Sequence, residues 1–310
     1  MENLPVIIIR FALFADLMVL AGITAFSMYA LSPQERISGV LPLKKPTVVL
    51  ALTGLALSTL GMFALVASMA GSSIWTVDGE VFREIVGESA IGTAWIVRMA
   101  AMILAVLAAI SIGRGQLAGH LALLASASIA IATLVWTGHA GATEGWVGTL
   151  HRLSDITHML AASVWIGGIA AFGMLLFRPV TAQTADCLPV AHRALEQFSR
   201  VGALAVGAII VTGVINSLAV MGLSQIMLLG QATYGKLLIV KMLLFGAMLA
   251  LAAFNRWKLT PAFGEGIRDD SPAKAVATLQ RSLLAEGAAA LAILSIVAWL
   301  GTLEPPGRAM

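Results

Sequence analysis

Residues 149–168 read TLHRLSDITHMLAASVWIGG, a stretch that opens with two histidines and an aspartate and then becomes almost wholly apolar. Such a pattern suits either a soluble helix with a metal site or a membrane helix whose first turns are polar. The composition separates the two, because 59% of the 310 residues are hydrophobic and only 11% are charged, whereas a soluble domain has about 25% charged residues. The stretch is therefore predicted to begin a membrane helix.

Eight segments are apolar over the roughly 20 residues that a bilayer span needs: 5–31, 47–70, 90–112, 117–138, 152–177, 199–221, 234–254 and 281–302. The first is longer than the apolar part of a signal peptide, and acidic Glu2 spoils the basic start, so we expect a retained helix. The prediction is an all-α, polytopic bundle of eight transmembrane helices. It forms one integral membrane domain over residues 1–310, with four helices in 1–138 and four in 139–310.

The distribution of Lys and Arg predicts the orientation, because cytoplasmic loops are enriched in basic residues. With the N-terminus outside, the inner loops hold 12 of the 19 basic residues: Arg36, Lys44, Lys45, Arg114, Arg178, Arg193, Arg200, Arg256, Lys258, Arg268, Lys274 and Arg281. Both termini are therefore predicted to face outside, which is the periplasm in a Gram-negative bacterium.

The polar start of the fifth segment is a candidate metal site. His151, Asp155 and His158 fall on one face of a helix. The two histidines are two turns, or about 10 Å, apart, too far to hold one ion alone, although Asp155 lies between them. A Gly-rich loop lets His139 fold back onto this face, and Met159 follows His158 directly. We expect all five residues to gather at the outer membrane surface.

Ligand chemistry narrows the choice of metal ion, but it leaves other functions of the protein open. Imidazole and carboxylate suit Cu(II), Zn(II) or Ni(II), while the thioether of Met159 favours Cu(I). A haem- or quinone-linked redox protein is an alternative, with His139 and His158 paired near the outer face and His120 and His192 near the inner face. A non-transporting scaffold with interfacial histidines is another.

Charged residues inside the spans are further candidates for a pathway or for structural pairing, because an unpaired charge in the bilayer is costly. Asp16 and Arg98 both fall near mid-bilayer, and we predict that they pair. Lys241 and Glu286 lie in the seventh and eighth segments. Asn216 is expected to hydrogen-bond across helices.

Two more groups complete the candidates. Glu88, Trp95 and Met102 are predicted to form a stripe on one face of the third span. At the inner face, Cys187 and His192 are candidates for a metal exit site.

Several classes of function are disfavoured by the sequence. A single cysteine excludes an intramolecular disulfide and a Cys-based zinc cluster. No basic block with interleaved aromatic residues suggests nucleic acid, and no nucleotide-binding motif is found. Any transport of an ion by this chain would therefore be passive or gradient-driven and not an enzymatic reaction, with the lipid bilayer as its surroundings.

The segment SDITHMLAASVWIGG resembles the D-x-x-H-x-x-A-x-x-x-W-x-G-G motif of the copper-resistance protein D family. Two further segments are similar to that family: YGKLLIVKMLLFGAMLALAAFNRWKL, with its two lysines and Asn-Arg pair, and LQRSLLAEGAAALAILSIVAWLGTLEPP, with its arginine, glutamate and Pro-Pro. The resemblance covers residues 134–306 well, and the first four segments fit in number and hydropathy.

The resemblance implies an inner-membrane protein of bacterial copper resistance and homeostasis, which transports Cu(I) or Cu(II) from periplasm to cytoplasm. It also implies a periplasmic copper-binding partner of the CopC type, since this chain carries no Met-rich or His-rich extension of its own. Matched position by position, the family's polar residues fall on His139, His151, Asp155 and His158.

Overall fold

The computed structural model describes residues 4–112, 117–178, 182–222, 230–269 and 271–304, and these residues form helices without any strand. The long helices are α1 (Leu4–Ala30), α3 (Lys44–Ala70), α5 (Ala90–Ser111), α6 (Leu117–Ala132), α7 (Gly145–Leu176), α8 (Ala182–Met221), α9 (Thr233–Phe254) and α11 (Ala273–Leu300). Arg114 and the Pro305–Pro306 pair lie outside the described residues.

Shorter helices join or extend the long ones. They are α2 (Pro33–Ser38), η1 (Ile74–Thr76), α4 (Gly79–Glu88), η3 (Thr133–Thr137), η4 (His139–Ala142), the π-helical turn η6 (Asn255–Leu259) and α10 (Thr260–Arg268). Much of the polar sequence expected to be connecting loop is thus helical.

The prediction of eight membrane helices is confirmed, because eight helical stretches of the described chain are long and apolar enough to span a bilayer. Their limits differ from the predicted ones at the candidate site. Helix α7 begins at Gly145, so His151 lies inside the helix and not at its first turn. Helix α6 tightens into the 3₁₀ turn η3 at Thr133, before the predicted end of the fourth span.

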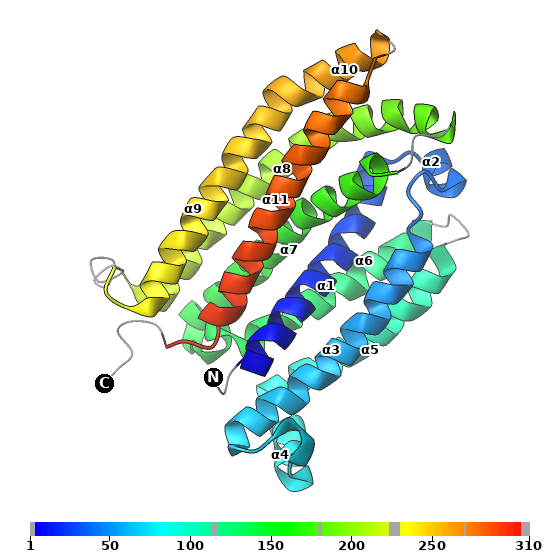
Figure 1. Cartoon of the computed structure of the whole chain (residues 1–310). Helices are drawn as coiled ribbons and strands as arrows, with labels where there is room; N and C mark the ends of the chain where they lie inside the picture. Colours follow the sequence, from blue (N-terminus) through cyan, green and yellow to red (C-terminus); the bar gives the residue numbers. More distant parts are fainter. Residues whose placement is uncertain (1–3, 113–116, 179–181, 223–229, 270, 305–310) are drawn as a thin grey trace.

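Figure 1 shows the helices as a slanted bundle in which α1 begins and α11 ends at the same end. We call this end the terminal face; it holds the start of α1, α7 and α9 and the end of α11. The opposite face holds α2 and α10. Helix α1 lies at the centre, packed against α7, α3, α6 and α11. The side of the membrane on which each face lies stays a prediction.

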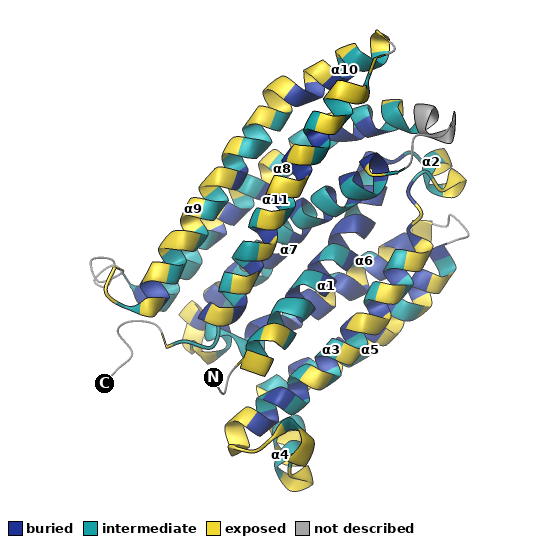
Figure 2. Cartoon of the chain, in the orientation of Figure 1, coloured by how far each residue is buried: buried dark blue, intermediate teal, exposed yellow. Residues whose placement is uncertain are grey.

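Burial follows this arrangement (Figure 2). Leu17, Leu20 and Phe26 of α1 are completely buried in the main hydrophobic core, while α9 carries exposed apolar side chains such as Leu243, 69% exposed. An outer helix with exposed apolar residues is what a lipid environment allows, because lipid tails are as apolar as these side chains.

Two glycines let α1 and α7 approach closely. A Cβ on Gly167 would lie 2.1 Å from the carbonyl carbon of Gly22, and a Cβ on Gly22 would lie 2.0 Å from the carbonyl oxygen of Ser163. The next residue, Gly168, makes room for the ring of Phe198 on α8. Gly167 and Gly168 thus allow α7 to approach α1 and α8 closely.

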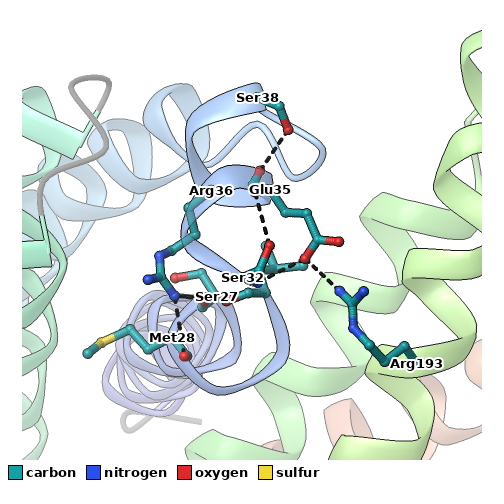
Figure 3. A network of polar contacts seen from close by, with 8 residues as sticks. Ser27, Met28, Ser32, Glu35, Arg36, Ser38 and Arg193 are labelled. Atoms are coloured by element: carbon teal, nitrogen blue, oxygen red, sulfur yellow. Dashed lines mark hydrogen bonds and ion pairs between the residues drawn. The ribbon is translucent and has the colours of Figure 1, made fainter.

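At the opposite face, α2 ties the first half of the chain to α8 (Figure 3). Ser32 and Glu35 form a capping box, in which the Ser32 N–H donates to Glu35 Oε2 at 2.8 Å. The same oxygen accepts from Arg193 at 2.5 Å. Arg36 donates to the carbonyl oxygen of Leu31 at the end of α1 at 2.8 Å. The turn after α1 is thereby fixed against α8.

Candidate functional site

The polar face of α7 lies in the part of the bundle near the terminal face. His151 is 3% exposed, whereas Asp155 and His158, one and two turns further along, are half-buried. Each of the three has a hydrogen-bond partner on a neighbouring segment. Those partners determine how the side chains are presented.

Thr143 links the loop that carries His139 to His151. Its hydroxyl donates to the carbonyl oxygen of His139 at 3.2 Å and lies 3.1 Å from His151 Nδ1. A threonine hydroxyl has one proton, and here the backbone carbonyl takes it. With that proton on the carbonyl, His151 Nδ1–H is placed to donate to the Thr143 oxygen, which assigns the proton of the neutral ring to Nδ1.

Thr212 of α8 orients His158 by the same logic. Its hydroxyl donates to the carbonyl oxygen of Ala208 at 2.5 Å and lies 2.9 Å from His158 Nδ1. The Thr212 oxygen therefore accepts from Nδ1–H, and the lone pair of neutral His158 is on Nε2. A ring fixed through Nδ1 in this way is prepared to bind a metal through Nε2.

Asp155 connects α7 to α8 through a hydrogen bond and interacts electrostatically with two cations. Asn216 Nδ2 donates to Asp155 Oδ1 at 3.2 Å, which confirms the predicted hydrogen bond of Asn216 across helices. The positive charges of Lys241 on α9 and Arg10 on α1 act on the Asp155 carboxylate. Lys241 also acts on His158. The Asp-His pair thus lies between α7, α8 and α9.

His139 reaches the same end of the bundle, where its ring contacts α9 and the end of α11. Its Nε2 lies 3.3 Å from the carbonyl oxygen of Leu300 at the end of α11, and its ring meets Tyr234 of α9 edge-on at 5.8 Å. Met159 is buried in the main core, about 100° around the helix from His158. Within the described residues, no three His, Cys, Asp or Glu side chains form an assembled metal site.

A second polar cluster lies further along the same helices, towards the opposite face. Glu286 of α11 is 3% exposed. It accepts hydrogen bonds from Trp165 Nε1 of α7 at 3.4 Å and from Asn255 Nδ2 at the start of η6. Ser282 donates to Asn255 Oδ1 at 2.7 Å. Three spans therefore meet at one buried carboxylate, and a π-helical turn, a feature common at functional sites, supplies one of its partners.

The predicted Asp16–Arg98 pair is wrong. Arg98, 4% exposed, donates to Ser58 Oγ at 2.8 Å and to Thr133 Oγ1 at 3.4 Å. Asp16 is 6% exposed and neither of its carboxyl oxygens has a hydrogen-bond partner. Its Oδ2 lies over Gly54, which leaves it room. The two charges lie on different helices, and the packing of α1 and α5 on α3 keeps them apart.

The predicted stripe of Glu88, Trp95 and Met102 is also wrong, because Glu88 does not lie on the same helix as the other two residues. Glu88 is exposed and ends α4, and Ser89 caps the separate helix α5. Trp95 donates to the Ser58 carbonyl oxygen at 3.1 Å, and Met102 is completely buried. The helix break at Ser89 separates the carboxylate from the other two.

At the opposite face, a cavity of about 820 Å³ lies between α8 and the η6–α10 segment. Its lining includes His192, Glu196, Arg200, Arg256 and Arg268. The His192 ring packs over Gly264 and against Phe263 at 5.9 Å. Cys187, also on α8, is half-buried and outside the lining.

Thr143, Thr212, Tyr234 and Arg10 were not predicted from the sequence as members of the site. Thr212 and Asn216 are four residues apart on α8, and Asp155 and His158 are three residues apart on α7. Each pair therefore spans about one helical turn. Polar residues at helical spacing in two apolar segments are the signal that would have found this contact.

These observations define a polytopic, all-helical membrane protein with polar residues buried at two depths between α7, α8, α9 and α11. Comparison with known families is consistent with that class. The sequence model described as Copper resistance protein D-like, N-terminal domain, matches residues 1–149, and the model described as Copper resistance protein D matches residues 192–300.

Relatives with curated names give the same result. The chain is 37% identical over 306 residues to Copper resistance protein D of Pseudomonas syringae pv. tomato, which is 98% of each chain. The chain belongs to the copper resistance protein D family, and it is a multi-pass protein of the inner membrane.

Two other relatives are more distant. Inner membrane protein YebZ of Escherichia coli (strain K12) is 29% identical over 174 residues, 56% of this chain and 55% of that protein. Copper transport protein CutJ of Bacillus subtilis (strain 168) is 29% identical over 228 residues, 72% of this chain and 39% of that protein. No solved structure matches the chain.

Proposed function

We propose that this protein transports copper across the inner membrane, from the periplasm at the terminal face to the cytoplasm at the opposite face. The observation that carries the proposal is the common orientation of two histidines. Nδ1 of His151 and Nδ1 of His158 each lie within hydrogen-bond distance of a threonine hydroxyl, and a ring held through Nδ1 can bind a metal ion through Nε2.

The remaining ligands are proposed to gather when copper arrives. Asp155 lies one turn from each histidine, and Met159 follows His158 in the chain. His139 is already tied to His151 through Thr143. Rotation of its ring away from the Leu300 carbonyl would bring a third imidazole towards α7. A site that assembles on binding also releases its ion more easily than a rigid one.

The second polar cluster is proposed as the next station for the ion. Glu286 holds a buried carboxylate beside Trp165 of α7, the helix that carries His158. Copper leaving the histidines would pass along α7 towards Glu286 and then to the cavity at the opposite face, where His192 lines the wall. Transport along the concentration gradient of copper requires no chemical step, so we propose a transporter and not an enzyme.

The donor is proposed to be a separate periplasmic copper-binding protein of the CopC type. The described terminal face offers the exposed Trp146 and the half-buried His139, while His151 is buried. These are short segments that a partner protein would contact directly.

Copper binding by purified variants tests the site. His158→Ala is expected to reduce bound copper, and Thr212→Val to weaken affinity about 10-fold, because orienting groups contribute 10- to 100-fold to metal affinity. Thr157→Ala, an exposed neighbour on the same helix, is the control and should bind as the unaltered protein does. Equal copper stoichiometry and affinity in all four proteins would refute the site.

Transport and its direction need a separate assay. Proteoliposomes with a defined orientation are loaded with copper on one side, and the appearance of copper on the other side is followed with and without the protein. We expect faster movement from the terminal face to the opposite face. No movement in either direction would refute transport even if the site binds copper.

A further inference from the structure

A small cavity lies between α1, α3, α5 and η3, away from the proposed copper site. Its volume is about 50 Å³, and its polar lining comes from Arg10, Arg98, Ser58 and Thr137. The rest of the lining is apolar, with side chains such as Leu13, Leu65 and Leu134. Two arginines thus line one small, mostly apolar space.

Arg98 has no carboxylate partner in the described parts of the chain. Its donors go to the neutral hydroxyls of Ser58 and Thr133, and the one ion pair among these residues is Glu35–Arg193. A guanidinium group inside a membrane span usually pairs with a carboxylate or with backbone carbonyl oxygens, and the hydrogen bonds of Arg98 to Ser58 and Thr133 supply neither. Asp16, the expected partner, does not supply that anion.

Arg10 adds a second positive charge to the same cavity. One of its donors goes to the Thr137 carbonyl oxygen at 2.8 Å, while its Nε is buried with no hydrogen-bond partner. Its charge acts unfavourably on Arg98. Asp155 is the negative charge that acts on Arg10, and it is already shared with Lys241 and Asn216.

We propose that this cavity binds a small inorganic anion, chloride in the cell. Two arginine side chains that line one cavity favour a negative ion between them, because guanidinium groups make strong charge-assisted hydrogen bonds to anions. Ser58 accepts from Arg98 through its oxygen, which leaves its O–H to point into the cavity as a further donor.

Size selects the class of anion. A water molecule takes about 30 Å³ in the liquid, so a cavity of about 50 Å³ suits a monatomic ion better than an organic acid or a lipid headgroup. The apolar part of the lining favours a weakly hydrated halide over a strongly hydrated phosphate, because the ion must lose water to enter. This site does not depend on copper transport.

Thermal unfolding of the purified protein tests the proposal. The full chain in detergent is heated in sodium chloride, sodium bromide or sodium gluconate at the same ionic strength. An anion that binds only the folded protein raises the unfolding midpoint with its concentration. Chloride and bromide are expected to raise it by about 2–4 °C, and the bulky gluconate is expected to leave it unchanged.

Three variants identify the residues that hold the ion. Arg98→Gln should abolish the chloride effect. Arg83→Gln, an exposed arginine on α4, and Asp16→Asn should both keep it. A chloride effect that survives Arg98→Gln would overturn the proposal. If Asp16→Asn instead creates or enlarges the effect, then Asp16 is the counter-ion of Arg98, and the proposal is equally overturned.

A direct observation covers the case in which Arg98→Gln does not fold. Crystals of the unaltered protein grown in bromide should show anomalous scattering from an ion between Arg10 and Arg98. Bromide found only on the protein surface, or water alone in the cavity, would show that no anion site exists.

Discussion

Lys241 is a cation beside a proposed cation site. It acts on both Asp155 and His158 from α9, so it offsets the negative charge that would hold copper and opposes the charge of the ion itself. A transporter must release its cargo, and a nearby cation limits how tightly that cargo binds. Lys241 is therefore placed to set the balance between capture and release.

Lys241→Met is expected to tighten copper binding about 10-fold, equal to ~1.4 kcal/mol, because one repulsive unit charge at this range is worth that order of energy. Transport should become slower, because release is slower. Affinity is measured by competition with a copper chelator and transport in proteoliposomes. Lys236→Met removes the same charge from an exposed position on the same helix and should change neither value; a similar effect in both variants would contradict this role.

Single residues show which parts of the site could be predicted from the sequence and which could not. Asp155 and His158 were found because their spacing alone places them on one helix face. Their partners Thr212 and Asn216 depend on which face of α8 meets α7, and that depends on packing. Asp16 and Arg98 have the right depth to pair, but depth says nothing of direction around each helix.

At the scale of elements, the contact between α1 and α7 rests on Gly22 and Gly167. The backbones approach so closely that a Cβ on Gly167 would lie 2.1 Å from the carbonyl carbon of Gly22. Helix α7 carries residues of the proposed copper site, and α1 carries Arg10 of the proposed anion site, so the same contact positions both proposed sites.

Gly167→Ala is expected to destabilise the protein by about 1–3 kcal/mol, the usual cost of forcing extra atoms into a packed interior. Gly173→Ala on the same helix meets no atom within 4 Å and should be neutral or slightly stabilising, since alanine favours the helix. The midpoint of thermal unfolding in detergent measures both. Equal midpoints for the two variants would show that the close contact is not needed.

The eight spans were predictable because a run of about 20 apolar residues has few alternatives to a membrane helix. The helices between them were not. The segment 178–200 looks like a polar connection, yet α8 begins at Ala182 and presents Arg193 to Glu35. Its polar side chains include a partner for α2, and hydropathy alone does not reveal this pairing. Ser89 similarly ends one helix and caps the next within a single apolar pattern.

At the scale of the whole molecule, the Glu35–Arg193 ion pair joins the first two helices to the second half of the chain. Burial tends to raise the pKa of Glu35, but the hydrogen bonds from Arg193 and Ser32 outweigh it and hold this pKa below its ordinary value. A carboxylate with a lowered folded-state pKa stabilises the fold above its unfolded pKa, and the contribution is lost as pH falls through the lowered value.

Glu35→Gln is therefore expected to cost about 0.5–1 kcal/mol at pH 7, a modest value because the Arg193 side chain is 44% exposed and solvent screens the pair. The difference from the unaltered protein should vanish in acid, where Glu35 is protonated in both states. Unfolding midpoints measured from pH 7 downwards check this. A difference that stays constant with pH would contradict an ionic contribution. Glu265→Gln, an exposed glutamate at the same face, is the control.

The π-helical turn η6 holds one more residue than an α-helical turn would, as the hydrogen bond from the Thr260 N–H to the Asn255 carbonyl oxygen shows. Because of this extra residue, the segments on either side are out of phase. Asn255 can face Glu286 while Phe263, completely buried, faces the core. Deleting one residue from 256–258 would restore a regular helix and turn α10 by about 100° about the axis of α9, taking Phe263 out of the core and dismantling the wall of the large cavity. One inserted residue thus lets one continuous helical segment contact the buried carboxylate of Glu286 and also form a wall of the large cavity.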